Sequence, residues 1–281
     1  MPELPEVETV RRTLEPLITE TTIEAIEIRY AGIVKEPADT EAFKHLLIGQ
    51  TFQSIDRLGK FLLFRLDDYT LVSHLRMEGK YGIFDPEDAT DTHTHVIFSL
   101  SNGKQLRYKD VRKFGTMHVK LKGNELNTAP LNKLGFEPFD ERFTPEYLAE
   151  SLHKTTRKIK TVLLDQTIVT GLGNIYVDEA LFWSEIHPER IANTLTYEEC
   201  VRLHEMIRKV LDDAIQVGGS SIRSYLNSLG EIGMFQLQIA VYGKEGEACK
   251  VCGTPIEKIK VGGRGTHFCP ACQSASAQKQ D

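Results

Sequence analysis

Four cysteines near the end of the chain constrain its fold more than any other feature. They form two Cys-x2-Cys pairs, Cys249 with Cys252 and Cys269 with Cys272. Two such pairs can place four thiolates around one tetrahedral zinc ion and leave no open position for water, so we predict one structural zinc ion. The fifth cysteine, Cys200, lies on the apolar stripe of a predicted helix and is interpreted as a small buried side chain.

The residues between the two cysteine pairs predict a small β-hairpin. The segment Lys260-Val-Gly-Gly-Arg264 places an arginine beside a glycine-rich tip. Such a tip suits contact with a nucleic acid duplex, although zinc ribbons that bind only proteins look similar. Clustered Cys-x2-Cys pairs are typical of metal sites in a reducing, cytosolic compartment.

The first half of the chain changes from helical to strand periodicity. Val7, Val10 and Leu14 share one face of a predicted helix after Pro2. Alternating residues then predict short strands, and one helix followed by many strands favours a β-sandwich or barrel. The strand-like runs lie near 26–30, 51–66, 69–76, 79–84, 94–100, 104–109 and 115–122.

The second half is predicted to be helical. Residues 123–140 are rich in glycine, proline and asparagine and are interpreted as a linker. The longest predicted helix begins at the capping box of Thr196 and Glu199 and ends at Gly218-Gly219. Shorter helices are predicted near 145–153, 157–165 and 175–184.

The charge of the chain is unevenly distributed. The net charge is −6, yet residues 104–122 hold seven Lys or Arg and one Asp, a local charge of +6. A second basic run begins at Lys154. Such segments can be solvated faces or phosphate-binding surfaces, and charge alone does not decide between them. Neither a membrane-length apolar run nor a basic, apolar leader is present in the sequence, so we expect no membrane span and no export.

The N-terminus offers a nucleophile. Removal of Met1 before the small Pro2 would expose a secondary amine, and α-amino groups have a pKa of roughly 7.7–8.0. Such an amine can attack a sugar C1′ and form a cationic iminium. Glu3 and Glu6 could supply an acid beside it. Acidic residues at a helix start also have a purely structural interpretation.

Three segments together resemble bacterial formamidopyrimidine-DNA glycosylase, of the helix-two-turns-helix superfamily. They are Pro2-Glu3-Leu4-Pro5-Glu6, residues 165–179 and the cysteine quartet, and the resemblance runs from Pro2 to Cys272. It implies an α+β protein that binds damaged double-stranded DNA as a monomer in the bacterial cytoplasm, associated with the nucleoid. The implied domains are a β-sandwich with a leading helix over 1–131, a helix-two-turns-helix domain over 132–234, a zinc hairpin over 235–273 and a polar tail over 274–281.

The resemblance also implies an activity, excision of oxidised purines followed by strand cleavage through β- and δ-elimination. Pro2 matches the nucleophile and Glu3 the essential acid. Glu6 supports them. Lys60 matches a hairpin lysine that holds the phosphate near the lesion, and Arg264 matches a phosphate clamp that we group with the catalytic residues.

Further residues match DNA contacts of the family. His74 and Asn174 match backbone contacts, and Lys154 is added from the basic run. Met77, Arg112 and Phe114 match the side chains that fill the space left by an extruded base, where the arginine reads the orphaned cytosine and the phenylalanine wedges the stack. Weaker candidates for the wall of the base pocket are Glu78, Ser220, Ile222, Arg223, Ser224, Tyr225 and Tyr242.

Two other functions fit part of the sequence. An endonuclease VIII-like glycosylase would act on oxidised pyrimidines, but Leu4 and the three void-filling residues favour the purine enzyme. A zinc protein that binds DNA without catalysis would explain the charges and cysteines, but not the Pro2-Glu3 pair with Lys60. A metal-dependent nuclease has little support, because no carboxylate cluster of the required kind is present in the sequence and the cysteine site is closed.

Overall fold

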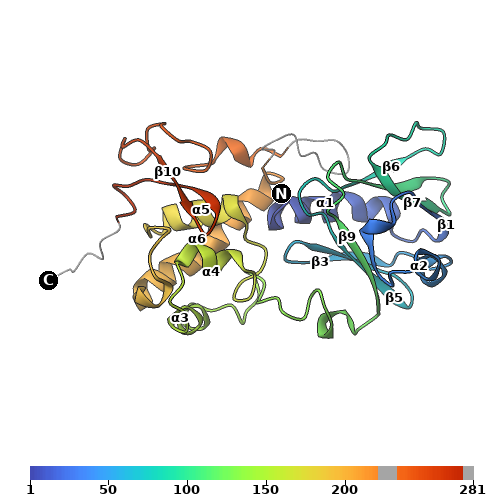
Figure 1. The fold of residues 1–281 in the computed structure, drawn as a ribbon, viewed down its shortest axis with the longest axis horizontal. Helices are drawn as coiled ribbons and strands as arrows, with labels where there is room; N and C mark the ends of the chain where they lie inside the picture. The colour runs from blue at the N-terminus through green and yellow to red at the C-terminus, as the bar shows by residue number, and fades with distance from the viewer. Residues whose placement is uncertain (221–232, 275–281) are drawn as a thin grey trace. The chain divides into compact units, whose positions relative to one another are not determined.

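The computed structural model describes residues 1–220 and 233–274. Its contacts divide the chain into an N-terminal unit, Met1–Lys133 with Val217–Met234, and a C-terminal unit, Leu134–Gln216 with Phe235–Asp281 (Figure 1). The boundary after Lys133 falls inside the predicted linker, where the short 3₁₀ helix Glu125–Asn127 lies among turns. None of the helices in the described parts of the chain combines the length and the apolar character that a membrane span requires.

Two sheets form most of the N-terminal unit. The neighbouring strands pair antiparallel, except that β2 runs parallel to β9. The four-stranded sheet has the order β1 (Ile23–Ile28), β7 (Thr94–Leu100), β8 (Gln105–Lys109), β6 (Lys80–Phe84). The five-stranded sheet has the order β2 (Val34–Glu36), β9 (Thr116–Leu121), β5 (Tyr69–His74), β4 (Phe61–Arg65), β3 (Ser54–Leu58).

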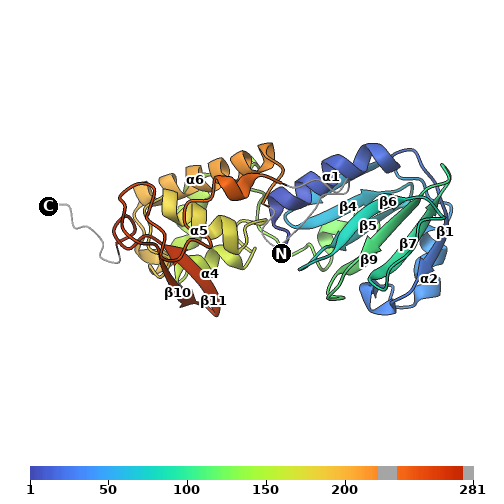
Figure 2. The same cartoon turned by 90° about the horizontal axis from the view of Figure 1, so that it is seen from above.

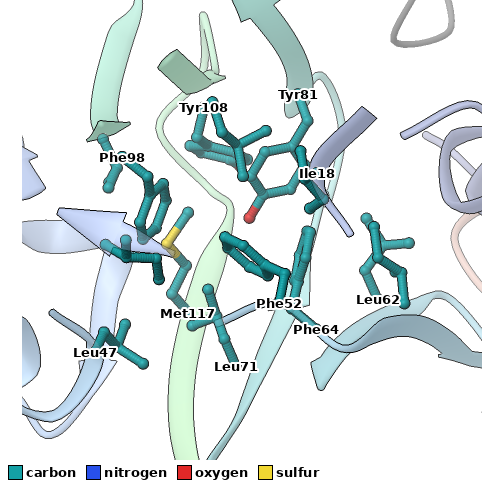
Figure 3. Close-up of a cluster of buried hydrophobic side chains, with 14 of the residues drawn as sticks. Ile18, Leu47, Phe52, Leu62, Phe64, Leu71, Tyr81, Phe98, Tyr108 and Met117 are labelled. Carbon is teal, nitrogen blue, oxygen red and sulfur yellow. The ribbon is translucent and has the colours of Figure 1, made fainter. Parts of the chain in front are cut away.

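One apolar core joins the two sheets and the leading helix α1 (Leu4–Ile18). The predicted apolar face of α1 is confirmed, because Val7, Val10 and Leu14 are at most 1% exposed. Figure 3 shows aromatic rings from both sheets meeting in this core, among them Phe64 and Tyr108. Burial of these faces fixes the register of the strands, since a slip by one residue would turn every apolar side chain outward.

The sequence patterns missed one helix of this unit, α2 (Thr40–Leu47). Asp39 caps it by accepting hydrogen bonds from the backbone N–H groups of Glu41 and Ala42 at 2.8 and 3.3 Å. Phe43 and Leu47 are its buried residues. Two apolar residues four positions apart are too short a pattern to stand out, so only the Asp cap could have indicated this helix.

The C-terminal unit contains four α-helices among its described residues, followed by a hairpin. The capping box predicted at the start of α6 is confirmed, because Thr196 and Glu199 exchange side-chain to backbone hydrogen bonds of 2.8 and 3.2 Å. Gly218, with φ +77°, follows its end. The elements are α3 (Pro145–His153), α4 (Ile159–Leu164), α5 (Asn174–Trp183), α6 (Tyr197–Gln216), β10 (Glu257–Val261) and β11 (Arg264–Phe268), with 3₁₀ helices at Ala192–Thr194 and Phe235–Leu237. The N-terminal unit has a further 3₁₀ helix at Ala31–Ile33. Figure 2 shows the helices and the hairpin of the C-terminal unit and the two sheets of the other, which confirms the predicted mixed fold with an N-terminal sandwich.

Candidate catalytic and nucleic-acid-binding sites

The start of α1 buries the predicted nucleophile and its acids. Pro2 is buried, and Glu3 and Glu6 are 2% and 3% exposed. Glu3 is the N-cap of α1, and its backbone N–H donates to Glu6 Oε2 at 2.8 Å, the arrangement of a capping box. The structural interpretation of these acids therefore holds for both Glu3 and Glu6, since the Glu3 side chain also accepts from the Glu6 backbone N–H. It does not exclude a chemical role, since burial beside the chain terminus is also what a catalytic acid requires.

Glu6 also holds a distant part of the chain. Its Oε1 accepts hydrogen bonds from the backbone N–H and the hydroxyl of Ser220, at 2.7 and 3.1 Å. Gly219 has φ +77°, and a Cβ atom there would lie 2.8 Å from Glu6 Oε1. Glycine is thus required on both conformational and steric grounds. The other predicted residues of this pocket loop, Ile222, Arg223, Ser224 and Tyr225, lie outside the described residues.

Lys60 occupies the turn of the β3–β4 hairpin. Leu58 pairs with Phe61, so Gly59 and Lys60 form a two-residue turn, and Gly59 has φ +57°. A positive φ at the first central position matches the turns that glycine favours in hairpins. Lys60 is 6% exposed. Arg57 braces the turn by donating to the Gly59 carbonyl at 3.0 Å.

The same arginine connects this turn to α1. Arg57 donates to Glu8 Oε2 at 3.1 Å. Burial by itself would raise the pKa of Glu8, but hydrogen bonds from Arg11 and Arg12 and the charge of Arg57 lower this pKa to about 2. The ionised Glu8 therefore ties the Lys60 hairpin to the helix that carries Pro2 and Glu3.

His74 lies at the end of β5 and is neutral at physiological pH. Burial and the charges of Arg76 and Lys60 lower the pKa of His74 to about 3. Its Nδ1 accepts a hydrogen bond from the Arg76 backbone N–H at 2.9 Å. The proton of the neutral ring therefore resides on Nε2, which is left as a donor.

The three predicted void-filling residues lie on two turns of the N-terminal unit. Met77 is half-buried, and Glu78 beside it is exposed, in the turn between β5 and β6. Arg112 and Phe114 lie in the connection between β8 and β9, where the Phe114 side chain is 52% exposed. The Arg112 guanidinium lies 4.7 Å from the centre of the Phe114 ring. Exposed apolar side chains on turns are poorly explained as core residues and fit contact with a ligand.

Arg264 is exposed at the tip of the β10–β11 hairpin. Val261 pairs with Arg264, so Gly262 and Gly263 form the turn, with φ +55° and +79°. Positive φ at both central positions is the signature of a type I′ turn, which favours glycine. A Cβ atom on Gly262 would lie 2.5 Å from the Thr161 side chain, so the tip packs closely on α4.

Asn174 reaches this hairpin from the first turn of α5. Its Nδ2 donates to the Gly265 carbonyl at 2.9 Å. The N-cap of α5 is Gly173, and Asn174 is the first residue of the helix. Asn174 joins the helix start to the residue that follows Arg264, which places two predicted phosphate contacts next to each other.

A buried ion pair fastens the hairpin further. Lys160 donates to Asp178 at 2.6 Å, and both side chains are 0% exposed. Lys160 also donates to the Gly265 carbonyl at 3.2 Å, while Asp178 accepts from the His267 backbone N–H at 2.9 Å. Burying two charges costs desolvation energy that their attraction often only balances, so a buried pair is weak evidence of added stability. We interpret this pair as one that orients the hairpin.

Two further predicted residues lie elsewhere in the C-terminal unit. Lys154 is exposed at the C-cap of α3. Tyr242 is half-buried, and its ring packs at 5.1 Å from the His267 ring. The Tyr242 backbone N–H donates to Glu179 at 2.9 Å, one of three consecutive N–H groups that Glu179 binds.

The four cysteines form a site that fits zinc. Their Sγ atoms lie within 4.8 Å of one another. The Cys252–Cys269 and Cys249–Cys272 separations are 3.4 and 4.0 Å, close to the roughly 3.8 Å between thiolates that each bind zinc at about 2.3 Å. Backbone N–H groups point at two of the sulfur atoms, the outer contacts that metal thiolates use, at 3.4 Å to Cys249 and 3.5 Å to Cys269.

Sequence reasoning missed the buried carboxylates that hold these segments. Asp178 and Glu179 fall inside the segment 165–179, but nothing in their spacing distinguishes them from surface acids. Asp110 is the single acid within the basic run 104–122, and that isolation is the one sequence signal that could have singled it out.

Comparisons with models of known protein families match three segments of the chain. Residues 1–117 match the formamidopyrimidine-DNA glycosylase N-terminal domain. Residues 134–225 match the formamidopyrimidine-DNA glycosylase H2TH domain, as the predicted helix-two-turns-helix fold requires. Residues 246–275 match a zinc finger found in FPG and IleRS, which together with the cysteine geometry confirms the predicted zinc site.

Close relatives cover nearly the whole chain. The formamidopyrimidine-DNA glycosylases of Bacillus licheniformis and Bacillus subtilis are each 60% identical, over 97% and 98% of this chain and 99% of each relative. The structure is similar to that of Lactococcus lactis Fpg in complex with DNA containing an abasic site, with a TM-score of 0.91 and 48% identity over 97% of this chain and 99% of that one. The chain therefore belongs to the formamidopyrimidine-DNA glycosylase family.

Proposed function

We propose that this protein excises oxidised purines from duplex DNA and then cleaves the strand at the resulting abasic sugar. The observation that carries the proposal is the burial of Pro2, Glu3 and Glu6 together at the start of α1 in a chain of this family. The solved Lactococcus lactis relatives hold DNA with an abasic site and DNA with an N7-benzyl-Fapy-dG lesion, which supports a damaged duplex as the partner.

The first step is displacement of the damaged base. After removal of Met1, the Pro2 nitrogen attacks C1′ while the bond from C1′ to the base breaks. The Glu3 carboxyl group donates a proton to the ring oxygen of the sugar or to the departing base. The C1′–O4′ bond then breaks with its electrons going to O4′, and the proton lost from the amine supplies whichever of O4′ and the base Glu3 did not protonate. The product is an iminium between Pro2 and the opened sugar, which carries positive charge without a further proton because the amine is secondary.

Strand cleavage follows from the same intermediate. The iminium withdraws electrons, so loss of a proton from C2′ expels the 3′ phosphate by β-elimination. A second elimination expels the 5′ phosphate, and water then releases the remaining sugar fragment from Pro2. Glu6 keeps its place in this scheme as a support, since its carboxylate is occupied by Glu3 and Ser220.

The remaining predicted residues bind and orient the DNA. Lys60, the Nε2–H of His74, Asn174 and Arg264 contact phosphates, with Lys154 as an additional contact. Met77, Arg112 and Phe114 fill the space of the extruded base, which is supported by the exposure of Phe114. Glu78, Ser220 and Tyr242 are kept as candidates for the pocket wall. Zinc has a structural role when bound, holding the hairpin that presents Arg264.

The proposed cellular setting is a monomer in the bacterial cytoplasm that associates with the nucleoid. Excision assays with 8-oxoguanine opposite cytosine and with thymine glycol test the substrate class. We expect preferential release of 8-oxoguanine, in short reactions that contain EDTA. A clear preference for thymine glycol would instead support the endonuclease VIII-like activity, and binding without any cleavage would support the non-catalytic alternative.

A further inference from the structure

The connection between β8 and β9 is exposed, yet its conformation is well defined. Val111 and Phe114 are 57% and 52% exposed, and Arg112 and Lys113 are exposed as well. Lys113 adopts φ +58°, a conformation that side chains other than glycine rarely take. Since little apolar packing is available to these side chains, polar contacts must hold this loop.

Asp110 supplies those contacts. Its Oδ1 accepts a hydrogen bond from the Arg112 backbone N–H at 3.0 Å. Its Oδ2 accepts hydrogen bonds from the backbone N–H groups of Phe114 and Gly115 at 2.9 and 2.8 Å. One side chain therefore binds the backbone of Arg112 and Phe114, two of the three residues that we propose fill the space of the extruded base.

Asp110 is itself fixed on every side. Its side chain is 1% exposed. Its backbone N–H donates to the His93 carbonyl at 2.9 Å, and its carbonyl lies 2.7 Å from His95 Nε2. A carbonyl can only accept, so Nε2 donates in this contact. These bonds anchor the loop to the four-stranded sheet.

Tyr108 extends the arrangement to the neighbouring turn. Its hydroxyl donates to Asp110 Oδ2 at 3.3 Å. A Cβ atom on Gly115 would lie 1.6 Å from this hydroxyl oxygen, and one on Gly79 would lie 2.4 Å from it. Gly79 closes the turn that carries Met77, through a 2.9 Å hydrogen bond to the Leu75 carbonyl. The hydroxyl thus packs against both turns.

We infer that Asp110 is a positioning residue for base extrusion, which holds Arg112 and Phe114 ready to enter the duplex, and that Tyr108 links them to Met77. The inference rests on the proposed function. Unstacking a base costs free energy. If the side chains that replace the base became ordered only on binding, their ordering would reduce the binding free energy further, so they should be ordered before the DNA binds. A misplacement of about 1 Å can reduce a rate about 100-fold.

The test compares two substrates with the variant Asp110→Asn, which retains the size of the side chain but replaces one acceptor oxygen by an NH₂ donor. The first substrate is 8-oxoguanine in a duplex, whose base must be extruded. The second is a duplex with a preformed abasic site, which has no base to extrude. Asp39→Asn is the control, because the Asp39 side chain also accepts hydrogen bonds from backbone N–H groups, two of them, but lies at the start of α2.

We expect Asp110→Asn to slow excision of 8-oxoguanine by about 10- to 100-fold and to change abasic-site cleavage by less than about threefold. The ratio of excision rates with cytosine and with adenine opposite the lesion should decrease, because Asp110 no longer fixes the backbone of Arg112. Phe114→Ala should add little in the Asp110→Asn background, since the two changes act on one step. Asp39→Asn should resemble the wild type on both substrates.

Equal losses on both substrates, or unchanged excision and opposite-base preference, would overturn the inference. If Asp110→Asn does not fold, Tyr108→Phe removes only the hydroxyl, and it should show the same substrate-dependent loss in milder form. Wild-type protein that cleaves neither substrate would instead refute the proposed function, so the two failures are distinguishable.

Discussion

Glu6 and Ser220 are joined by two hydrogen bonds although 214 positions separate them in the chain. Glu6 Oε1 accepts from both the backbone N–H and the hydroxyl of Ser220, while Oε2 accepts from the Glu3 backbone N–H. The buried Glu6 carboxylate thus binds Glu3, which is both the N-cap of α1 and the predicted acid. The same carboxylate binds Ser220, at which the predicted pocket loop begins. This contact makes the glycine beside Ser220 a sensitive position.

Gly219→Ala should damage both stability and excision. The new Cβ would lie 2.8 Å from Glu6 Oε1, in a backbone conformation with φ +77°. The strain costs roughly 1–2 kcal/mol. Displacing Glu6 from Ser220 costs about 1.5–3 kcal/mol more. Thermal unfolding and single-turnover excision measure the two effects.

Gly103→Ala is the control for that variant. Gly103 has φ +79°, but a Cβ atom there meets nothing within 4 Å. It should show the strain alone, with normal excision. Equal behaviour of the two variants would contradict the role assigned to the Glu6 contact.

Glu8→Gln should remove a pH-dependent part of the stability. The pKa of Glu8 is lowered from 4.5 to about 2 in the folded chain. Its stabilising effect is therefore complete above pH 4.5 and is lost as the pH falls toward 2. Its size is at most about 3.5 kcal/mol, from about 1.4 kcal/mol per pKa unit. Urea unfolding of the wild type and the variant should differ at pH 7 and converge in acid.

The exposed Glu24 provides the comparison. Glu24→Gln, which removes an exposed carboxylate, should leave the free energy of unfolding at pH 7 unchanged. A Glu8→Gln variant that parallels the wild type across this pH range would show that the arginine cluster contributes no net stability.

Cys249→Ser should reduce the affinity for DNA. Its effect on the N-terminal unit should be smaller. Loss of zinc removes support from the hairpin that presents Arg264. The slope of log affinity against log salt should fall by about one for each phosphate that the variant no longer binds. Cys200→Ala should keep both zinc and affinity, because Cys200 is buried on α6 and lies outside the cysteine quartet. Full affinity in zinc-free protein would contradict this role.

Glu3→Gln should abolish base excision and leave DNA binding largely intact. The amide retains the shape of the side chain but cannot donate the proton that the departing group needs. Excision assays and equilibrium binding to a duplex with 8-oxoguanine separate the two effects. Loss of both activities in a folded variant would mean that Glu3 has a structural role instead.

Periodic and spaced features could be predicted from the sequence, and isolated contacts could not. Helices, strands and metal-binding cysteine pairs each require residues at fixed intervals. Such intervals are present in the helix with Val10 and Leu14, in the alternating strands and in the paired cysteines. Asp110 and Asp178 carry no such interval, because their partners are backbone groups brought near by folding. Phe114 is a case in which residue type misleads. A phenylalanine is expected in the core, but the structure exposes this side chain. Recognising Pro2, Lys60 and Arg112 as site residues depended on the family resemblance.

The Pro2 amine is the centre of the proposed chemistry, and one experiment addresses it directly. Borohydride reduces an iminium to a stable amine, so reaction of the protein with an 8-oxoguanine duplex in its presence should leave the DNA linked to the protein. Mass spectrometry of the linked peptide should place the adduct on Pro2, and Pro2→Gly should remove both the adduct and the excision. An adduct on a lysine would discard Pro2 as the nucleophile, and an untouched lesion with Met1 shown to be absent would contradict the glycosylase mechanism altogether.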